Sequence, residues 1–117
     1  MEDSRLNRSI LLDYYGELLT EKQRECFDLH YNEDLSLSEI AEQLGISRQG
    51  VWDNIRRAES AMQEMERKTG LIRKTQENRE ALGMLKSRLD ELCEMTGGEA
   101  KRLAREAAAE LARLIEE

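Results

Sequence analysis

The stretch from Ser36 to Ala58, SLSEIAEQLGISRQGVWDNIRRA, constrains the fold more than any other part of the chain. Ser36 followed by Glu39 is the capping-box pattern that starts a helix, and Gly45 can end that helix in the left-handed conformation. Ser47 then stands where a second helix needs its N-cap. Apolar residues follow the spacing that lets the two helices cross closely: Leu37, Ile40, Ala41, Leu44, Ile46, Val51 and Ile55. This skeleton predicts a helix-turn-helix.

The segments around this motif are also predicted to be helical. Residues 5–15 carry Leu6, Ile10 and Tyr14 on one face, with Leu11 and Tyr15 beside them, and Gly16 closes the segment. Thr20 and Gln23 form another capping box, which starts a helix. The inward side of that helix carries Gln23, Cys26, Phe27 and Tyr31, with Leu29 at its edge. The second helix of the motif continues through Ala58, Met62 and Met65, and Gly70 ends or bends it.

The pattern changes after Gly70. Leu82, Leu85, Leu89 and Leu92 form a narrow leucine seam, which extends backward through Asn78, Thr75 and Leu71. Gly97 and Gly98 break the chain, and a last helix carries Ala100, Leu103, Ala104, Ala107, Leu111, Leu114 and Ile115 on one face. We expect a helix-turn-helix domain at residues 1–70 and a C-terminal αα-hairpin at residues 71–117. A lone hairpin cannot bury its apolar stripe, so it should pack on the long helix, on a second copy of the chain, or on both.

Composition agrees with an all-α fold, because charged residues make up 37% of the chain, hydrophobic residues 39%, and proline is absent. No apolar run is long enough for a membrane span or a secretion signal. The only two cysteines, Cys26 and Cys93, are far apart and in no metal-type pattern. Reduced, packed thiols in a cytoplasmic protein are therefore expected.

The long helix of the motif has an outer face with the chemistry of base and phosphate recognition. With Val51 pointing inward, that face and its flanks carry Ser47, Arg48, Gln49, Trp52, Asp53, Arg56 and Arg57. Arginine pairs with guanine, glutamine pairs with adenine, and a helix N-terminus binds phosphate. Asp53 fits less easily, although a carboxylate can accept from cytosine N4. Trp52 is either an exposed contact residue or is covered by the adjacent hairpin, and the sequence leaves both possibilities open.

The charge balance opposes strong nucleic-acid binding. The formal net charge is -7, and most of the excess acid lies in the half that carries the motif. Within residues 36–58, the cations Arg48, Arg56 and Arg57 are matched by Glu39, Glu42 and Asp53. Few counterions would be released on binding, so a monomer should bind DNA weakly and with strong salt sensitivity. A dimer with two recognition helices would compensate through avidity.

Catalysis and metal binding have little support in the sequence. His30 is the only histidine, and no nucleophile motif accompanies it. Cys26 and His30 are four residues apart on one helix and could supply two metal ligands, but a zinc site needs three or four. Packing at the edge of the core is the better interpretation of both residues. We therefore expect no enzyme activity, no cofactor and no metal.

The stretch LLTEKQRECFDLHYNEDLSLSEIAEQLGISRQGVWDNIRRAES resembles region four of bacterial sigma factors, the helix-turn-helix that contacts promoter DNA. It is closer still to the YlxM-type helix-turn-helix proteins of Gram-positive bacteria. The segments LLTEKQ, SLSEIAE and SRQGVWDNIRR carry this resemblance, together with the total length. The resemblance implies a gene neighbour that encodes the signal recognition particle protein, and a regulatory role in that targeting pathway.

Two classes of function follow. The first is a regulator that binds nucleic acid, with DNA favoured because a helix fits the major groove of B-form DNA better than that of A-form RNA. The RNA of the signal recognition particle is the other nucleic-acid candidate. The second class is a protein-interaction module that uses the same fold to modulate the particle's GTPases. The surface around Arg48, Trp52, Arg56 and Arg57 separates the two, because groove insertion requires it to be exposed.

Overall fold

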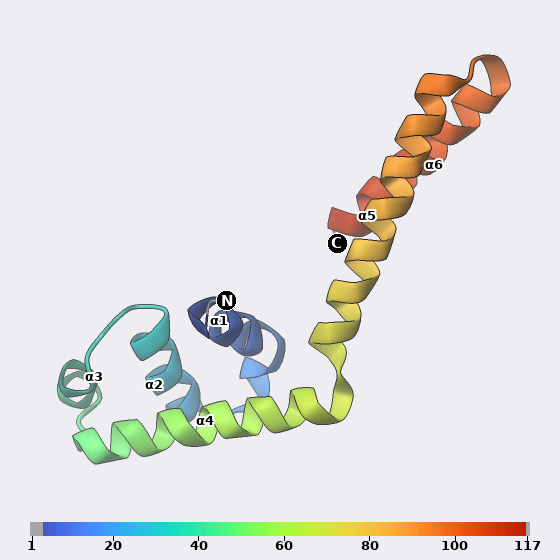
Figure 1. Cartoon of the computed structure of the whole chain (residues 1–117). Coiled ribbons are helices and arrows are strands. Elements are labelled where there is room, and N and C mark those ends of the chain that lie inside the picture. The colour runs from blue at the N-terminus through green and yellow to red at the C-terminus, as the bar shows by residue number, and fades with distance from the viewer. Residues whose placement is uncertain (1–3, 117) are drawn as a thin grey trace. The chain divides into compact units, whose positions relative to one another are not determined.

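The computed structural model describes the backbone of residues 4–116 and the side chains of residues 7–116. The regular elements in this range are all helices (Figure 1). They are α1 (Ser4–Tyr15), the short 3-10 helix η1 (Gly16–Leu18), α2 (Glu21–Tyr31), α3 (Leu37–Leu44), α4 (Arg48–Thr69), α5 (Leu71–Met95) and α6 (Gly98–Glu116). The predicted all-α fold is therefore confirmed. None of these helices is long and apolar enough to cross a membrane.

The chain forms two compact units, residues 1–72 and residues 73–117. The first unit contains α1 to α4 and the first two residues of α5. The second contains the rest of α5 together with α6.

Helix α4 is the centre of the first unit, because α1, α2 and α3 all pack against it (Figure 1). Its inward stripe was predicted correctly: Val51, Ile55, Ala58 and Met62 are each at most 1% exposed. The other buried residues of this core are Tyr15 of α1, Cys26 and Phe27 of α2, and Ile40 and Ala41 of α3. Full burial of one large aliphatic or aromatic side chain contributes about 1.5–3 kcal/mol, so this cluster supplies most of the unit's stability.

The predicted caps and turn of the helix-turn-helix are confirmed. Ser36 Oγ accepts the Glu39 N–H at 3.0 Å, and the Ser36 N–H donates to Glu39 Oε1 at 2.9 Å. Gly45 has a φ of 69°, and its N–H donates to the carbonyl of Ala41 at 2.9 Å. Ser47 Oγ accepts the Gly50 N–H at 2.9 Å. Ser36 and Ser47 thus each start their own helix, and Gly45 ends the first of the two.

The N-terminal helix turns a different face inward from the one predicted. Tyr15 is 4% exposed and Tyr14 is 37% exposed, so Tyr14 was wrongly placed on the inward stripe. The Tyr15 ring enters the core while its hydroxyl donates to Glu66 Oε1 at 2.7 Å and lies 2.7 Å from Thr69 Oγ1. Those two partners replace water, which is what lets a phenol be buried there. The side chain of Leu6, which belonged to the same prediction, lies outside the described residues.

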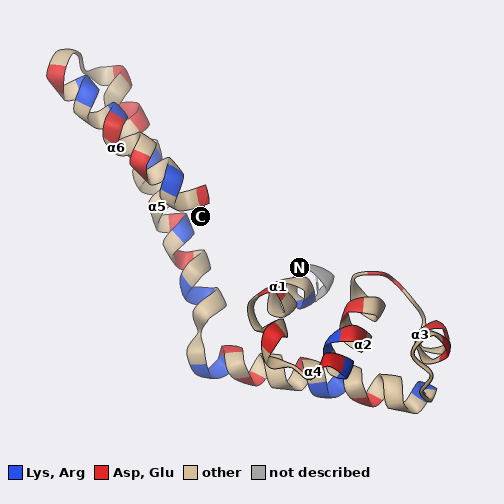
Figure 2. Cartoon of the chain, turned by 180° about the vertical axis from the view of Figure 1, so that it is seen from behind, with Lys and Arg blue, Asp and Glu red and all other residues tan. Residues whose placement is uncertain are grey.

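In the second unit, α5 and α6 run antiparallel and side by side, as the predicted αα-hairpin requires (Figures 1 and 2). Its apolar residues are distributed differently from the prediction. Ala104 and Ala108 are buried, whereas Leu103 and Leu114 are 55% and 54% exposed. The leucine seam of α5 also divides, since Leu82 and Leu89 are half-buried while Leu85 and Leu92 are exposed. The small alanines are thus the buried residues of α6, and its bulkier leucines lie to the side of them.

The left-handed Gly45 gives a direct test of the turn. A Cβ at this position would meet no atom within 4 Å, so the cost of Gly45→Ala is the backbone strain alone. We expect a loss of about 1–2 kcal/mol in the free energy of unfolding. Gly45→Asn is the control and should lose less, because asparagine adopts this conformation more readily. Urea unfolding followed by Trp52 fluorescence measures both, and equal stability of wild type and Gly45→Ala would contradict the assignment.

Candidate nucleic-acid interface

The predicted contact residues all lie at the surface of the first unit, in or just before the first three turns of α4. Ser47, Arg48, Gln49, Trp52, Asp53, Arg56 and Arg57 are exposed. Trp52 is 37% exposed, which is enough for one edge of the indole to touch a ligand. Ser47 also has a structural role, because its hydroxyl caps the helix.

These side chains form two adjacent open depressions. The first is lined by Leu37, Arg48, Gln49 and Trp52. The second is lined by Asp53, Arg56, Arg57 and Ser60. Leu37 and Ser60 were not predicted as site residues. Ser60 follows Arg56 by one helical turn, so the helical spacing would have identified it; Leu37 was assigned to the core, and the structure has it only partly buried there.

The three arginines of this surface are available to a ligand. Arg48, Arg56 and Arg57 form no ion pair with any residue that the structure describes. The end of the same helix behaves differently, because Glu64 accepts from Arg67 Nε at 3.0 Å and lies 3.9 Å from Lys68 Nζ. The Arg67 guanidinium accordingly lowers the pKa of the Glu64 carboxyl. Cationic charge on α4 is thus neutralised at its C-terminal end and left free near its N-terminal end.

Several carboxylates near the motif in sequence are occupied elsewhere. Glu39 belongs to the capping box of α3, and hydrogen bonds from Ser36 lower its pKa. Glu59 of α4 accepts from Arg8 Nε at 3.2 Å, on the side that faces α1. Arg8 also lies 4.4 Å from the centre of the Tyr31 ring, which fixes its position further. The charged residues of α3 are all acidic, whereas α2 and α4 carry both signs of charge (Figure 2).

Asp53 is the carboxylate that lies among the free arginines. Gln49 Nε2 donates to Asp53 Oδ1 at 3.0 Å, one helical turn away. This bond holds the Gln49 amide along the helix surface and leaves its oxygen available as an acceptor. The outer face from Arg48 to Ser60 therefore carries three positive charges and one negative charge, which is more basic than the balance of zero counted over residues 36–58.

The residues considered for metal binding are placed in the structure as packing residues. Cys26 is fully buried in the core, and burial raises the pKa of its thiol. His30 Nδ1 lies 2.9 Å from the carbonyl oxygen of Leu35 and so ties the end of α2 to the loop before α3. Among the described residues, no three histidine, cysteine or acidic side chains converge on a possible ion site.

The chain is similar in sequence to a family of known proteins. A family model described as "Putative helix-turn-helix protein, YlxM / p13 like" matches residues 2–97. A relative from Thermoanaerobacter sp. (strain X514) is 47% identical over 90 residues, which cover 77% of each chain. A relative from Acetivibrio thermocellus is 51% identical over 85 residues, covering 72% of this chain and 73% of its own. One from Halalkalibacterium halodurans is 46% identical over 90 residues, covering 77% and 83%.

The capping box that positions α3 against α4 should make stability depend on pH. The folded-state pKa of Glu39 is lowered, so its contribution is present above the unfolded pKa and is lost as the pH falls through the folded pKa. We expect Glu39→Gln to reduce the loss of unfolding free energy between about pH 6 and about pH 3, where carboxyl groups titrate. Urea titrations at both pH values measure this. Glu42→Gln removes a carboxylate of the same helix that lies outside the box and is the control; an equal effect of the two substitutions would contradict the role of the box.

Proposed function

This chain belongs to the YlxM/p13-like helix-turn-helix family, and from that premise we propose that it is a non-enzymatic, cytoplasmic regulator that binds DNA through α4. The observation that carries the proposal is a set of three guanidinium groups on the exposed side of the second helix of the motif, those of Arg48, Arg56 and Arg57, which form no ion pair within the part of the chain that the structure describes. A recognition helix places such groups against base edges and phosphates in the major groove.

Each part of the surface has a role in this proposal. Ser47 and the first amides of α4 lie at a helix N-terminus, where backbone N–H groups favour a phosphate. Arg48, Gln49 and Trp52 form the leading edge, with Arg48 and Gln49 able to read guanine and adenine. Arg56 and Arg57 lie two turns further on and would contact the flanking phosphates. The Leu37 side chain beside Trp52 offers an apolar contact for a thymine methyl group.

The role within the cell follows from the resemblance to YlxM-type proteins. We propose that the regulated process is the signal recognition particle pathway of protein targeting. The chain would act as a homodimer joined through its C-terminal helices, because three arginines on one helix are too few for tight binding by a monomer at physiological salt. Two linked recognition helices raise the effective affinity.

A second candidate function is favoured by the apolar side of the first depression. Leu37 and Trp52 are neighbours there, and exposed tryptophan is enriched at protein interfaces. In this alternative the same surface binds one of the GTPases of the targeting pathway. The RNA of the particle is a further candidate for the same surface.

Gel-shift titrations with mixed duplex DNA and with the particle's RNA, each at about 50 mM and about 200 mM salt, separate the nucleic-acid candidates. If neither shifts at the lower salt while a pull-down retains a GTPase, the protein-binding function holds and the DNA proposal is wrong.

Arg56 provides the sharpest test of the DNA proposal. Arg56→Ala should weaken binding to duplex DNA by about tenfold and should reduce the slope of log K against log salt by about one, because one phosphate contact is lost. Arg67→Ala is the matched control: it removes an exposed arginine from the same helix, but one already paired with Glu64. Fluorescence anisotropy of a labelled duplex across a salt series measures both. Equal effects of the two variants would show that binding responds to overall charge and not to this face.

Asp53 should oppose binding, since its carboxylate lies between the arginines. Asp53→Asn keeps the size of the side chain and an oxygen that can accept from Gln49, while it removes the negative charge. We expect a severalfold higher affinity for duplexes of arbitrary sequence, as less repulsion meets the phosphates. The same anisotropy assay applies. A lower affinity for duplexes that carry cytosine at the contacted position would mean that Asp53 itself contacts DNA, as an acceptor from cytosine N4.

A further inference from the structure

Arg56 of the candidate interface has a carboxylate on either side of it along α4. Asp53 precedes it by three residues, and Glu59 follows it by three. Side chains at this spacing are neighbours on a helix surface, about 5–6 Å apart at Cβ, and opposite charges there can pair. Arg56 nevertheless forms no ion pair with a residue that the structure describes. Whatever occupies the two carboxylates therefore decides whether this guanidinium is available to a ligand.

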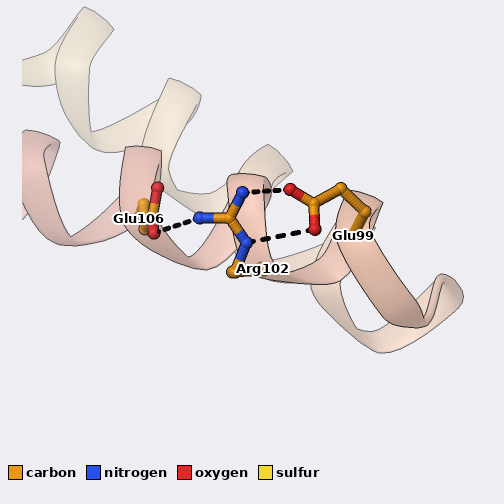
Figure 3. A network of polar contacts seen from close by, with 3 residues as sticks. All are labelled: Glu99, Arg102 and Glu106. Carbon is orange, nitrogen blue, oxygen red and sulfur yellow. Dashed lines mark hydrogen bonds and ion pairs between the residues drawn. The ribbon is translucent and has the colours of Figure 1, made fainter.

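Other exposed arginines of the chain show that such pairs do form on its helices. Arg67 Nε donates to Glu64, three residues earlier, at 3.0 Å. Arg102 bridges Glu99 and Glu106, three residues before it and four after it, with 2.7 Å from Nη1 to Glu106 Oε1 (Figure 3). A glutamate on either side of an arginine can thus engage it, provided that the carboxylate is not already taken.

Glu59 is engaged elsewhere, because both of its carboxylate oxygens have other donors. Arg8 Nε of α1 donates to Glu59 Oε1 at 3.2 Å, and Gln63 Nε2 of α4 donates to Oε2 at 3.3 Å. The Arg8 and Glu59 side chains are only 31% and 24% exposed, so water and salt screen this pair less than a fully exposed one. The Tyr31 ring holds Arg8 in turn, with its centre 4.4 Å from the guanidinium carbon.

Asp53 is engaged in a different way. Its Oδ1 accepts from Gln49 Nε2 at 3.0 Å, which occupies that oxygen but leaves the negative charge in place. Arg8, in contrast, is a cation, so it neutralises Glu59 as well as holding it. The ion pair adds no net charge beside Arg56. Removal of Arg8 would leave a bare carboxylate there, within reach of the guanidinium.

We propose that Arg8 is a positioning residue of the candidate nucleic-acid interface. It belongs to α1 and is not among the residues that line the two depressions. By holding and neutralising Glu59, it keeps the Arg56 guanidinium free for a phosphate. Docking of α1 on α4 and binding of a ligand by α4 are thereby coupled through one ion pair. The inference rests on the proposed function, since the surface that it concerns is the one that would bind DNA.

Substitutions at both ends of this ion pair test the positioning role by fluorescence anisotropy of a labelled duplex. Arg8→Met removes the charge but keeps a long side chain against Tyr31. It should raise the dissociation constant about twofold to fivefold, the equivalent of one exposed ion pair that DNA must break. Glu59→Gln in the same chain should restore wild-type affinity, because no carboxylate is left to compete. Arg8→Lys keeps the charge and should bind as the wild type does.

The matched control is Arg113→Ala, which makes the same change in net charge by removing a paired arginine from α6. It should leave the dissociation constant unchanged. If Arg8 contacts DNA itself, Arg8→Met weakens binding and Glu59→Gln does not restore it, which overturns the inference. If Arg8 only stabilises the fold, Arg8→Met weakens binding equally in an Arg56→Ala background, whereas the positioning role predicts no further loss there.

Nuclear magnetic resonance of the wild-type side chains needs neither DNA nor a change in α1. The Nε–H of Arg8 should exchange slowly with water and that of Arg56 rapidly, and Arg56→Lys assigns the second signal by removing it. In Arg8→Met the Arg56 Nε–H should exchange more slowly, and Glu59→Gln in that chain should make it rapid again. A slowly exchanging Arg56 Nε–H in the wild type overturns the inference.

The two measurements separate this inference from the proposed function. Exchange rates as expected, in a chain that shifts no duplex, would mean that the proposed function alone is wrong. A chain that binds duplex DNA, but in which Arg8→Met changes neither the affinity nor the exchange of the Arg56 Nε–H, would mean that the inference alone is wrong.

Discussion

The burial of one stripe on α4 determines what the rest of the first unit can do. Val51, Ile55, Ala58 and Met62 have almost no exposed surface, and the helices that cover them come from three separate segments of the chain. Such a stripe fixes the rotation of α4 about its own axis, because any turn would expose these side chains to water. That rotation in turn fixes the opposite side of the helix as the outer face. The positions of Gln49, Asp53 and Arg56 are therefore a consequence of core packing, and the core does not depend on their chemistry.

Net charge is a poor guide to this surface. The chain as a whole is acidic, with a formal charge of -7. Glu39, Glu59 and Glu64 are nevertheless engaged in a cap or in ion pairs. At physiological ionic strength, interactions between exposed charges are largely screened beyond about 8 Å. A bound phosphate would therefore respond mainly to the arginines of α4 and to Asp53.

The helix-turn-helix could be predicted from the sequence because its determinants are local. Capping boxes act within four residues, Gly45 needs only its own backbone conformation, and the stripe of α4 repeats with the period of a helix. The orientation of α1 could not be predicted, since Tyr14 and Tyr15 are equally apolar neighbours. The choice between them depends on Glu66 and Thr69, more than fifty residues away in the chain.

Which faces of α5 and α6 are buried could not be predicted for a related reason. Both helices carry apolar residues over a wide arc, and only the packing of the two helices shows which leucines stay exposed. The contact residues of the outer face are placed at the surface, while what they bind stays a prediction.

The junction between α4 and α5 has a consequence for how the chain folds. Glu66 Oε1, which accepts from Tyr15, also accepts the Ile72 N–H at 3.0 Å, and Thr69 Oγ1 accepts the Leu71 N–H at 3.2 Å. The last turn of one helix thus satisfies the first free amides of the next. Starting a helix is the unfavourable step of its formation, and each added residue afterward is nearly neutral or favourable. Helix α5 is 25 residues long and has no fully buried side chain of its own, so its formation should wait for this template. Helical order would then spread from the completed first unit toward the C-terminus, in the direction in which the ribosome releases the chain.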